Sequence, residues 1–260
     1  MHELDLALCR SALYEALALG FNPPTRTTVA RLLNEEQNAA LSELAAIIDA
    51  HTHSDRLGNL SPQVRRLWQL PEAQSLEALA EAYLHLFGHT AHAQVPLHET
   101  EYGEDTMFQQ PQQLGDISGF FNAFGLKLNP RQHERVDHIS CECEFMAFLT
   151  RKEAYAIQQN DVDMLEATRR GQRLFLRDHL GRFVPALTNL LRREDASGFY
   201  AALGNLCCDF VRGECARHQV QMGPEQLRLR PEAQDDACFT CGTGEEMIQI
   251  LRPSASAVEQ

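Results

Sequence analysis

The stretch Glu134-Arg-Val-Asp-His-Ile-Ser-Cys-Glu-Cys-Glu-Phe-Met146 holds the densest mixture of acidic, histidine, cysteine and large apolar residues in the chain. An α-helix turns about 100° per residue, so this spacing divides the side chains between two sides. One side carries His138, Glu142, Phe145, Met146 and Leu149, and another carries Asp137, Cys141 and Glu144. Polar groups thus lie within an apolar stripe. Polar residues in such a stripe usually form satisfied buried hydrogen bonds, here with an N-cap at Asp137. The same pattern is also compatible with a functional pair formed by His138 and Glu142.

Helical spacing of apolar residues continues on both sides of this stretch. A first helix of about 16 residues should end near Gly20, and a later helix should begin after an N-cap at Ser75. Further helices are expected at 35–50, 114–125, 134–158, 162–179, 180–193 and 196–218. No strand alternation, hairpin signal or internal repeat accompanies them, so the sequence predicts an all-α helical bundle of about eight to ten helices.

The helical periodicity is lost over residues 88–110, where proline, glycine and histidine accumulate. Loops of this length are uncommon inside compact domains and often carry function. We therefore expect an N-terminal helical portion at 1–130 that includes this loop, a C-terminal helical portion at 131–218 and an irregular cysteine-containing tail at 219–260. Together they are expected to form one domain.

The chain is acidic, with a formal charge of −13 from 23 Lys and Arg against 36 Asp and Glu. An acidic surface repels phosphate backbones and attracts cations, so a basic peptide is a better candidate partner than nucleic acid. Charged residues interrupt the apolar N-terminal stretch, and no run reaches the roughly 18 apolar residues of a membrane span. We expect a cytoplasmic protein, monomer or homodimer, whose 8 cysteines are reduced.

His138 and Glu142 lie four residues apart and could form a helical half-site for a metal or an acid–base pair. A catalytic site also needs convergent partners, and the chain has no HExxH, GxSxG, GxxxxGK[ST] or GxGxxG motif and no pair of ExxH motifs. An enzyme is therefore not expected, and no catalytic residue is assigned. A metal-dependent helical enzyme that uses this pair remains the first alternative.

Four residues toward the C-terminus have the spacing of a tetrahedral zinc site, since Cys215-x-x-His218 precedes Cys238-x-x-Cys241. The sequence requires no cofactor, and zinc at this cluster is a candidate. A redox-active or inert dithiol explains the same cysteines equally well. A cysteine-based zinc or redox sensor is therefore the second alternative.

Five motifs follow one another in the middle of the chain. They are Tyr83-x-x-Leu86-Phe87, Pro96-x-x-Glu99-x-x-Tyr102, Phe124-Gly125-Leu126, Asp137-His138-Ile139-x-x-Glu142-x-Glu144-Phe145-Met146 and Phe175-Leu-x-Asp178-His179-Leu180. In this order they resemble the TorD/DmsD family of molybdoenzyme maturation chaperones. The proline–glutamate–tyrosine loop and the Asp-His-Ile block are the most specific of them.

The resemblance implies an all-helical chaperone that binds the twin-arginine signal peptide or apo-form of a molybdenum oxidoreductase catalytic subunit, aids insertion of the molybdopterin cofactor and proofreads before export. The matching client-binding positions are Glu99, Tyr102, Asp137, His138 and Glu142, to which the helix adds Glu144. The C-terminal cysteines depart from the family pattern and suggest the subgroup that serves type II dimethyl sulfoxide reductase relatives. If Asp137 contacts the client, its replacement should weaken binding and change the melting temperature little.

Overall fold

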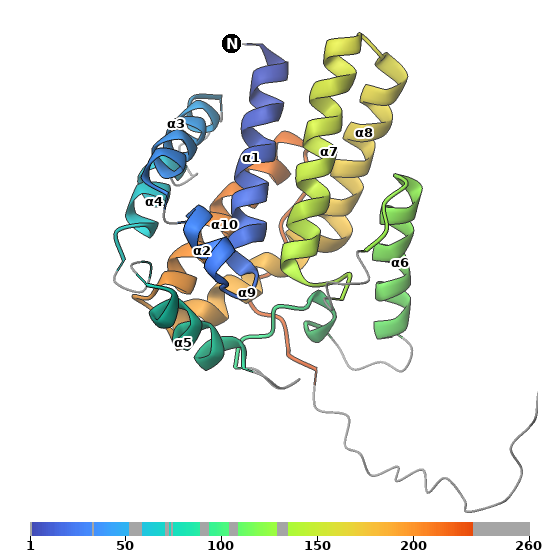
Figure 1. Ribbon diagram of the computed structural model, residues 1–260. Coiled ribbons are helices and arrows are strands. Elements are labelled where there is room, and N and C mark those ends of the chain that lie inside the picture. The colour runs from blue at the N-terminus through green and yellow to red at the C-terminus, as the bar shows by residue number, and fades with distance from the viewer. Residues whose placement is uncertain are drawn as a thin grey trace, which may run out of the picture. The chain divides into compact units, whose positions relative to one another are not determined.

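Helices make up almost all of the regular structure in the computed structural model, which describes residues 2–32, 34–51, 59–70, 73, 75–88, 94–103, 109–128 and 135–230 (Figure 1). They are α1 (Glu3–Phe21), α2 (Arg26–Leu32), α3 (Glu35–His51), α4 (Leu60–Leu67), α5 (Leu76–Phe87), η2 (Glu99–Glu101), α6 (Gln109–Ala123), α7 (Ile139–Gln159), α8 (Val162–Phe175), η3 (Leu176–Leu180), α9 (Gly181–Glu194) and α10 (Phe199–Arg217). Extended backbone in these residues pairs only at isolated bridges, His98 with His138 and Tyr102 with Leu229. The all-α class predicted from the sequence is confirmed.

The short helices α2 and α4 lie where the sequence predicted none. Each has only 7 or 8 residues, about two turns, which is too short for a helical period to be recognised. Longer elements match better, and the predicted N-cap at Ser75 is confirmed. The Ser75 hydroxyl oxygen accepts the Ala78 N–H over 3.0 Å at the start of α5.

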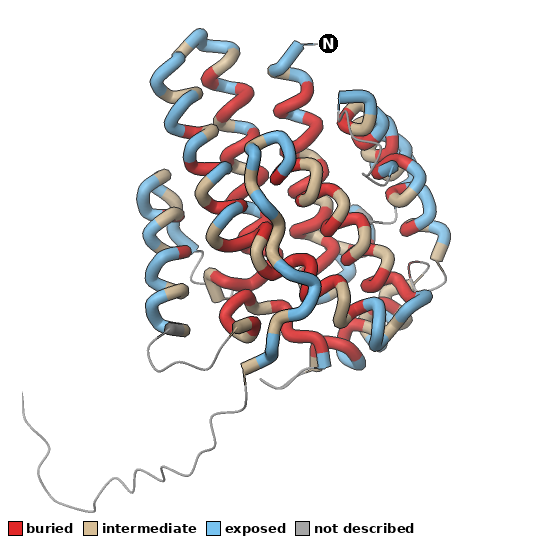
Figure 2. Tube along the Cα trace, turned by 180° about the vertical axis from the view of Figure 1, so that it is seen from behind, coloured by how far each residue is buried: buried red, intermediate tan, exposed pale blue. Residues whose placement is uncertain are grey.

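The core is centred on α1, which packs along α7 more extensively than any other two described elements pack together. The buried residues concentrate where the helices lie against one another (Figure 2). They include Leu13, Tyr14 and Leu17 of α1 and Phe145, Met146 and Leu149 of α7. Full burial of a large apolar side chain stabilises the fold by about 1.5–3 kcal/mol. The helix that carries the Asp-His-Ile block is therefore held by the centre of the core.

A buried polar network joins α1, α7, α8 and α10 around Arg10, whose side chain is 2% exposed. Its guanidinium donates to Glu214 over 2.8 Å, to Glu153 over 2.7 Å and to Gln172 over 2.6 Å. Burial alone would lower the pKa of Arg10, but Glu214 and Glu153 outweigh it and raise that pKa. Burial raises the pKa of Glu153, but Arg10 and the hydrogen bonds to this carboxylate outweigh it and lower that pKa to about 2. Each charge in the network depends on the others, because an unpaired buried charge is strongly destabilising.

The π-turn η3 lies between α8 and α9, and Pro185 follows it within α9. Pro185 has no backbone N–H, so the carbonyl of Gly181 lacks its usual helical donor. The N–H of Gly223 donates to that carbonyl over 3.0 Å. A side chain at Gly223 would collide with the backbone of Arg182, so glycine allows this close approach. The segment after α10 is thereby anchored on α9.

The helices named above belong to one compact unit, Met1–Arg230. The predicted tail at 219–260 is described only as far as residue 230, and that part contains no helix. In the described part of the chain, no helix has the length and hydropathy needed to span a membrane.

Candidate functional site

The loop at residues 94–103 pairs with the backbone that leads into α7, and the predicted client-binding residues other than Glu144 meet at this joint. The N–H of Glu99 donates to the carbonyl of Asp137 over 2.8 Å, and the N–H of Ile139 donates back into the loop over 2.9 Å. Asp137 and Ile139 thus bond to the loop, and the backbone before Ile139 forms only a single turn, in which the His138 N–H donates to the Arg135 carbonyl over 3.1 Å. For this reason α7 begins at Ile139, and the helix predicted at 134–158 begins too early.

Asp137 is completely buried, and its carboxylate ties the loop to the start of α7. Arg135 donates through Nε over 3.0 Å and through Nη2 over 2.9 Å. Thr100 donates through its hydroxyl over 2.7 Å and through its backbone N–H over 3.2 Å. The N-cap expected at Asp137 is instead His138, whose Nδ1 accepts the Ser140 N–H over 3.2 Å.

Glu99 and Tyr102 are also fully buried, and both have partners inside the protein. One Glu99 oxygen accepts from Arg182 over 3.1 and 2.7 Å, and the other lies 3.0 Å from His179 Nδ1. The Tyr102 hydroxyl donates to the carbonyl of Pro96 over 2.7 Å. Glu99 therefore holds the loop against η3 and α9, and Tyr102 ties the two ends of the loop together.

His138 is buried beside His98, with the two ring centroids 5.2 Å apart. Burial lowers the pKa of His138 to about 3, and His98 adds to this effect. The imidazole is therefore neutral at physiological pH and offers no positive charge to a ligand.

Glu142 is buried in the same joint, and neither carboxyl oxygen accepts a hydrogen bond from a described donor; the neighbouring Glu99 carboxyl can share a hydrogen bond with it only when one of the two acids is protonated. Burial, followed by the nearby Glu99 and Asp137 carboxylates, raises the pKa of Glu142 well above its usual range. The group is consequently held in its neutral, protonated form. A cationic ligand would find no formal charge on Glu142.

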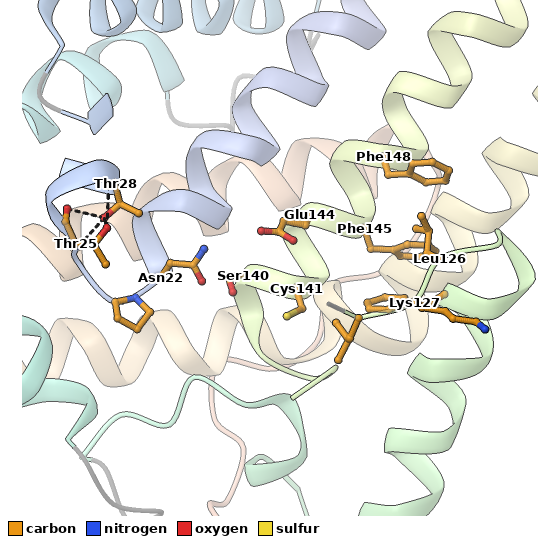
Figure 3. Close-up of a pocket in the computed structure, with 13 residues that line it drawn as sticks. Asn22, Thr25, Thr28, Leu126, Lys127, Ser140, Cys141, Glu144, Phe145 and Phe148 are labelled. Atoms are coloured by element: carbon orange, nitrogen blue, oxygen red, sulfur yellow. Dashed lines mark hydrogen bonds between the residues drawn. The ribbon is translucent and has the colours of Figure 1, made fainter. Parts of the chain in front are cut away.

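Glu144 differs from the other predicted residues because it is exposed. It lines an apolar pocket of about 590 Å³ between the α1–α2 turn, the residues after α6 and the first turns of α7. Its walls are Asn22, Pro23, Thr25, Thr28, Phe121, Leu126, Lys127, Leu128, Ser140, Cys141, Glu144, Phe145 and Phe148. Figure 3 shows the Glu144 carboxyl between Asn22 on one side and the cluster of Phe145, Phe148 and Leu126 on the other. Partial desolvation raises the Glu144 pKa.

A second hollow of about 330 Å³ continues from this pocket between α1 and α7. The two share Asn22, Glu144 and Phe148 as lining residues, so they form one depression, which we call the α7 groove. Arg151 of α7 and Glu15 of α1 line the second hollow and form an ion pair in which both side chains are about half exposed.

The sequence did not single out Thr100, Arg135 or Arg182, although they are the principal partners of Asp137 and Glu99. His179 had a signal, because it lies in the last of the five motifs. Its Nε2 also lies 3.3 Å from Asp116 of α6, so η3 connects the joint to that helix.

The predicted zinc site is only half described, because Cys238 and Cys241 lie outside the described residues. Cys215 is buried, and burial raises its thiol pKa to about 12, which disfavours the thiolate that a metal requires. His218 Nε2 lies 3.2 Å from Gln172 and 3.4 Å from Arg10 in the buried network. No group of three or more His, Cys, Asp or Glu in the described part of the chain could hold a metal ion.

The described chain is an all-helical protein in which a buried polar cluster lies beside an open, largely apolar groove. A family model described as "Nitrate reductase delta subunit" matches residues 30–189, more than half of the chain. The chain belongs to this family.

Curated relatives carry chaperone names. A perchlorate reductase assembly chaperone protein of Dechloromonas aromatica is 28% identical over 218 residues, which cover 81% of this chain and 90% of the relative. A chaperone protein TorD of Vibrio cholerae is 26% identical over 200 residues, covering 75% and 84%. A TorD of Photobacterium profundum is 30% identical over 101 residues, covering 39% and 45%.

These findings confirm the resemblance to the TorD/DmsD family that the five motifs suggested. The protein is a chaperone of this family and not an enzyme. The two alternatives, a helical enzyme using His138 and Glu142 and a cysteine-based sensor, receive no support from the family or from the relatives.

Proposed function

We propose that this chaperone acts in the cytoplasm on the catalytic subunit of a molybdopterin oxidoreductase. It binds the signal peptide or apo-form of that subunit, assists cofactor insertion and retains the subunit until it is ready for export. The perchlorate reductase named for the Dechloromonas relative suggests a client from the type II dimethyl sulfoxide reductase relatives.

The α7 groove is the observation that carries this proposal. Its volume falls in the range of about 300–1,000 Å³ that is typical of binding pockets. The first turns of α7, which line the groove, lie within the region matched by the family model. Apolar walls provide affinity for apolar side chains of a peptide, while an acidic residue between them favours a basic neighbour. The net charge of −13 also accelerates encounter with a positively charged segment.

The buried joint has a supporting role in this proposal. Asp137 holds the loop at 94–103 against the start of α7, and Glu99 holds the same loop against η3 and α9. This supporting role is structural and requires no catalytic nucleophile. The joint is a preorganised platform, which reduces the ordering cost of binding.

Calorimetric titration of the purified chain with a synthetic peptide tests this function. The probe is the signal sequence of a perchlorate reductase catalytic subunit, and its control is the same peptide with both arginines replaced by glutamine. We expect saturable binding of the first peptide and at least about tenfold weaker binding of the second, roughly 1.4 kcal/mol. Absence of binding both to the peptide and to a co-expressed apo-subunit would refute the proposal.

A further inference from the structure

The α7 groove has two unlike walls, and the exposed acid lies between them. Leu126, Phe145 and Phe148 form the apolar wall, whereas Asn22 comes from the polar α1–α2 turn (Figure 3). At the lip of the same pocket, Leu128 is 37% exposed, a high value for a large apolar side chain. An occupant therefore needs an apolar side and a polar side.

Glu144 carries a charge that no described cation neutralises. Lys127, Arg31 and Arg151 also line the groove, but no ion pair joins any of them to Glu144. The Lys127 ammonium points away from Glu144 (Figure 3), and Arg151 is already paired with Glu15. A cation brought by a partner would restore the favourable interaction that partial desolvation removes from this carboxylate.

We infer that Glu144 is the cation acceptor for the client segment and that Phe148 and Leu128 anchor its neighbouring apolar residues, so that the segment contacts the α7 groove and not the buried Asp137–Glu142 block. This inference rests on the proposed function and identifies the contacting surface. The occupant is a peptide with one arginine or lysine beside large apolar side chains. Asp137 then acts as a positioning residue.

Burial separates the two kinds of residue. Asp137, Glu99 and Glu142 are each 0% exposed, and the first two have their hydrogen bonds satisfied inside the protein. A client arginine could reach them only if the loop separated from α7. Glu144 is accessible without any rearrangement, and Phe148 is half-buried beside it.

The test is a double-mutant cycle by calorimetry with the signal-sequence peptide and its arginine-to-glutamine versions. Glu144→Gln should weaken binding of the arginine peptide about tenfold, and the loss should shrink at high salt. The peptide that lacks the contacting arginine should bind both proteins equally, because each change removes the same interaction. Phe148→Ala should also weaken binding about tenfold.

Matched controls separate local contacts from general effects. Glu166→Gln removes the same charge from an exposed position on α8, and Tyr155→Ala removes an exposed aromatic ring farther along α7, so neither should change binding. Melting curves show whether each variant is folded. If the wild type binds the peptide while Glu144→Gln and folded Phe148→Ala bind equally well, the inference is wrong and the proposed function stands. If the wild type binds neither peptide nor apo-subunit, the proposed function itself fails.

Discussion

Replacement of Asp137 by alanine should lower the stability of the whole protein, because this carboxylate closes the joint between the loop and α7. The substitution leaves the N–H and hydroxyl of the buried Thr100 without their acceptor, at a cost of about 1–3 kcal/mol for each donor. Arg135 is 40% exposed, so water can replace much of its lost interaction. We expect the free energy of unfolding to fall by about 2–5 kcal/mol.

A thermal melt followed by circular dichroism measures this loss. At about 2–4 °C per kcal/mol for a chain of this size class, the melting temperature should fall by roughly 4–20 °C. Thr100→Ser is the matched control, because it keeps both donors to Asp137 and should shift the melt by much less. If Asp137→Ala melts within about 1 °C of the wild type but no longer binds the signal peptide, Asp137 contacts the client directly and the reasoning from burial is refuted.

Three further changes test other parts of the structure. Glu142→Gln should raise the melting temperature at pH 8 and have a smaller effect near pH 5. The folded-state pKa of Glu142 lies above its unfolded value of 4.5, so ionisation of the unfolded chain destabilises the wild type as pH rises. If the difference in melting temperature between variant and wild type is the same at both pH values, this prediction is wrong. Arg10→Ala should lower the free energy of unfolding, measured with denaturant, by about 3–5 kcal/mol. In the wild type, the contribution of Glu153 to the free energy of unfolding should be lost as pH falls from 4.5 toward about 2. Incubation with a zinc chelator should leave the melting temperature unchanged, since Cys215 and His218 already lie in other contacts, and a clear fall would show a structural metal.

The sequence was sufficient to predict the fold class and most of the long helices. Repeated apolar residues determine which face of a helix is buried, and local groups such as the Ser75 cap act within a few residues of their partners. The five motifs also identified the family correctly. The short helices α2 and α4 escaped prediction because their two turns carry too little periodic signal.

The environment of each site residue was decided only by tertiary structure. From the sequence, Asp137 and Glu144 were both predicted to be acids available to a basic peptide. In the structure, Asp137 is buried beneath the loop at 94–103, whereas Glu144 faces an open groove. Arg10 gave no sign in the sequence that it would be buried between two acids from distant helices, Glu153 of α7 and Glu214 of α10. Burial and pairing depend on residues far apart in the chain, whereas periodicity and capping depend on neighbours, so the sequence determined the helices and their packing determined which charges remain accessible.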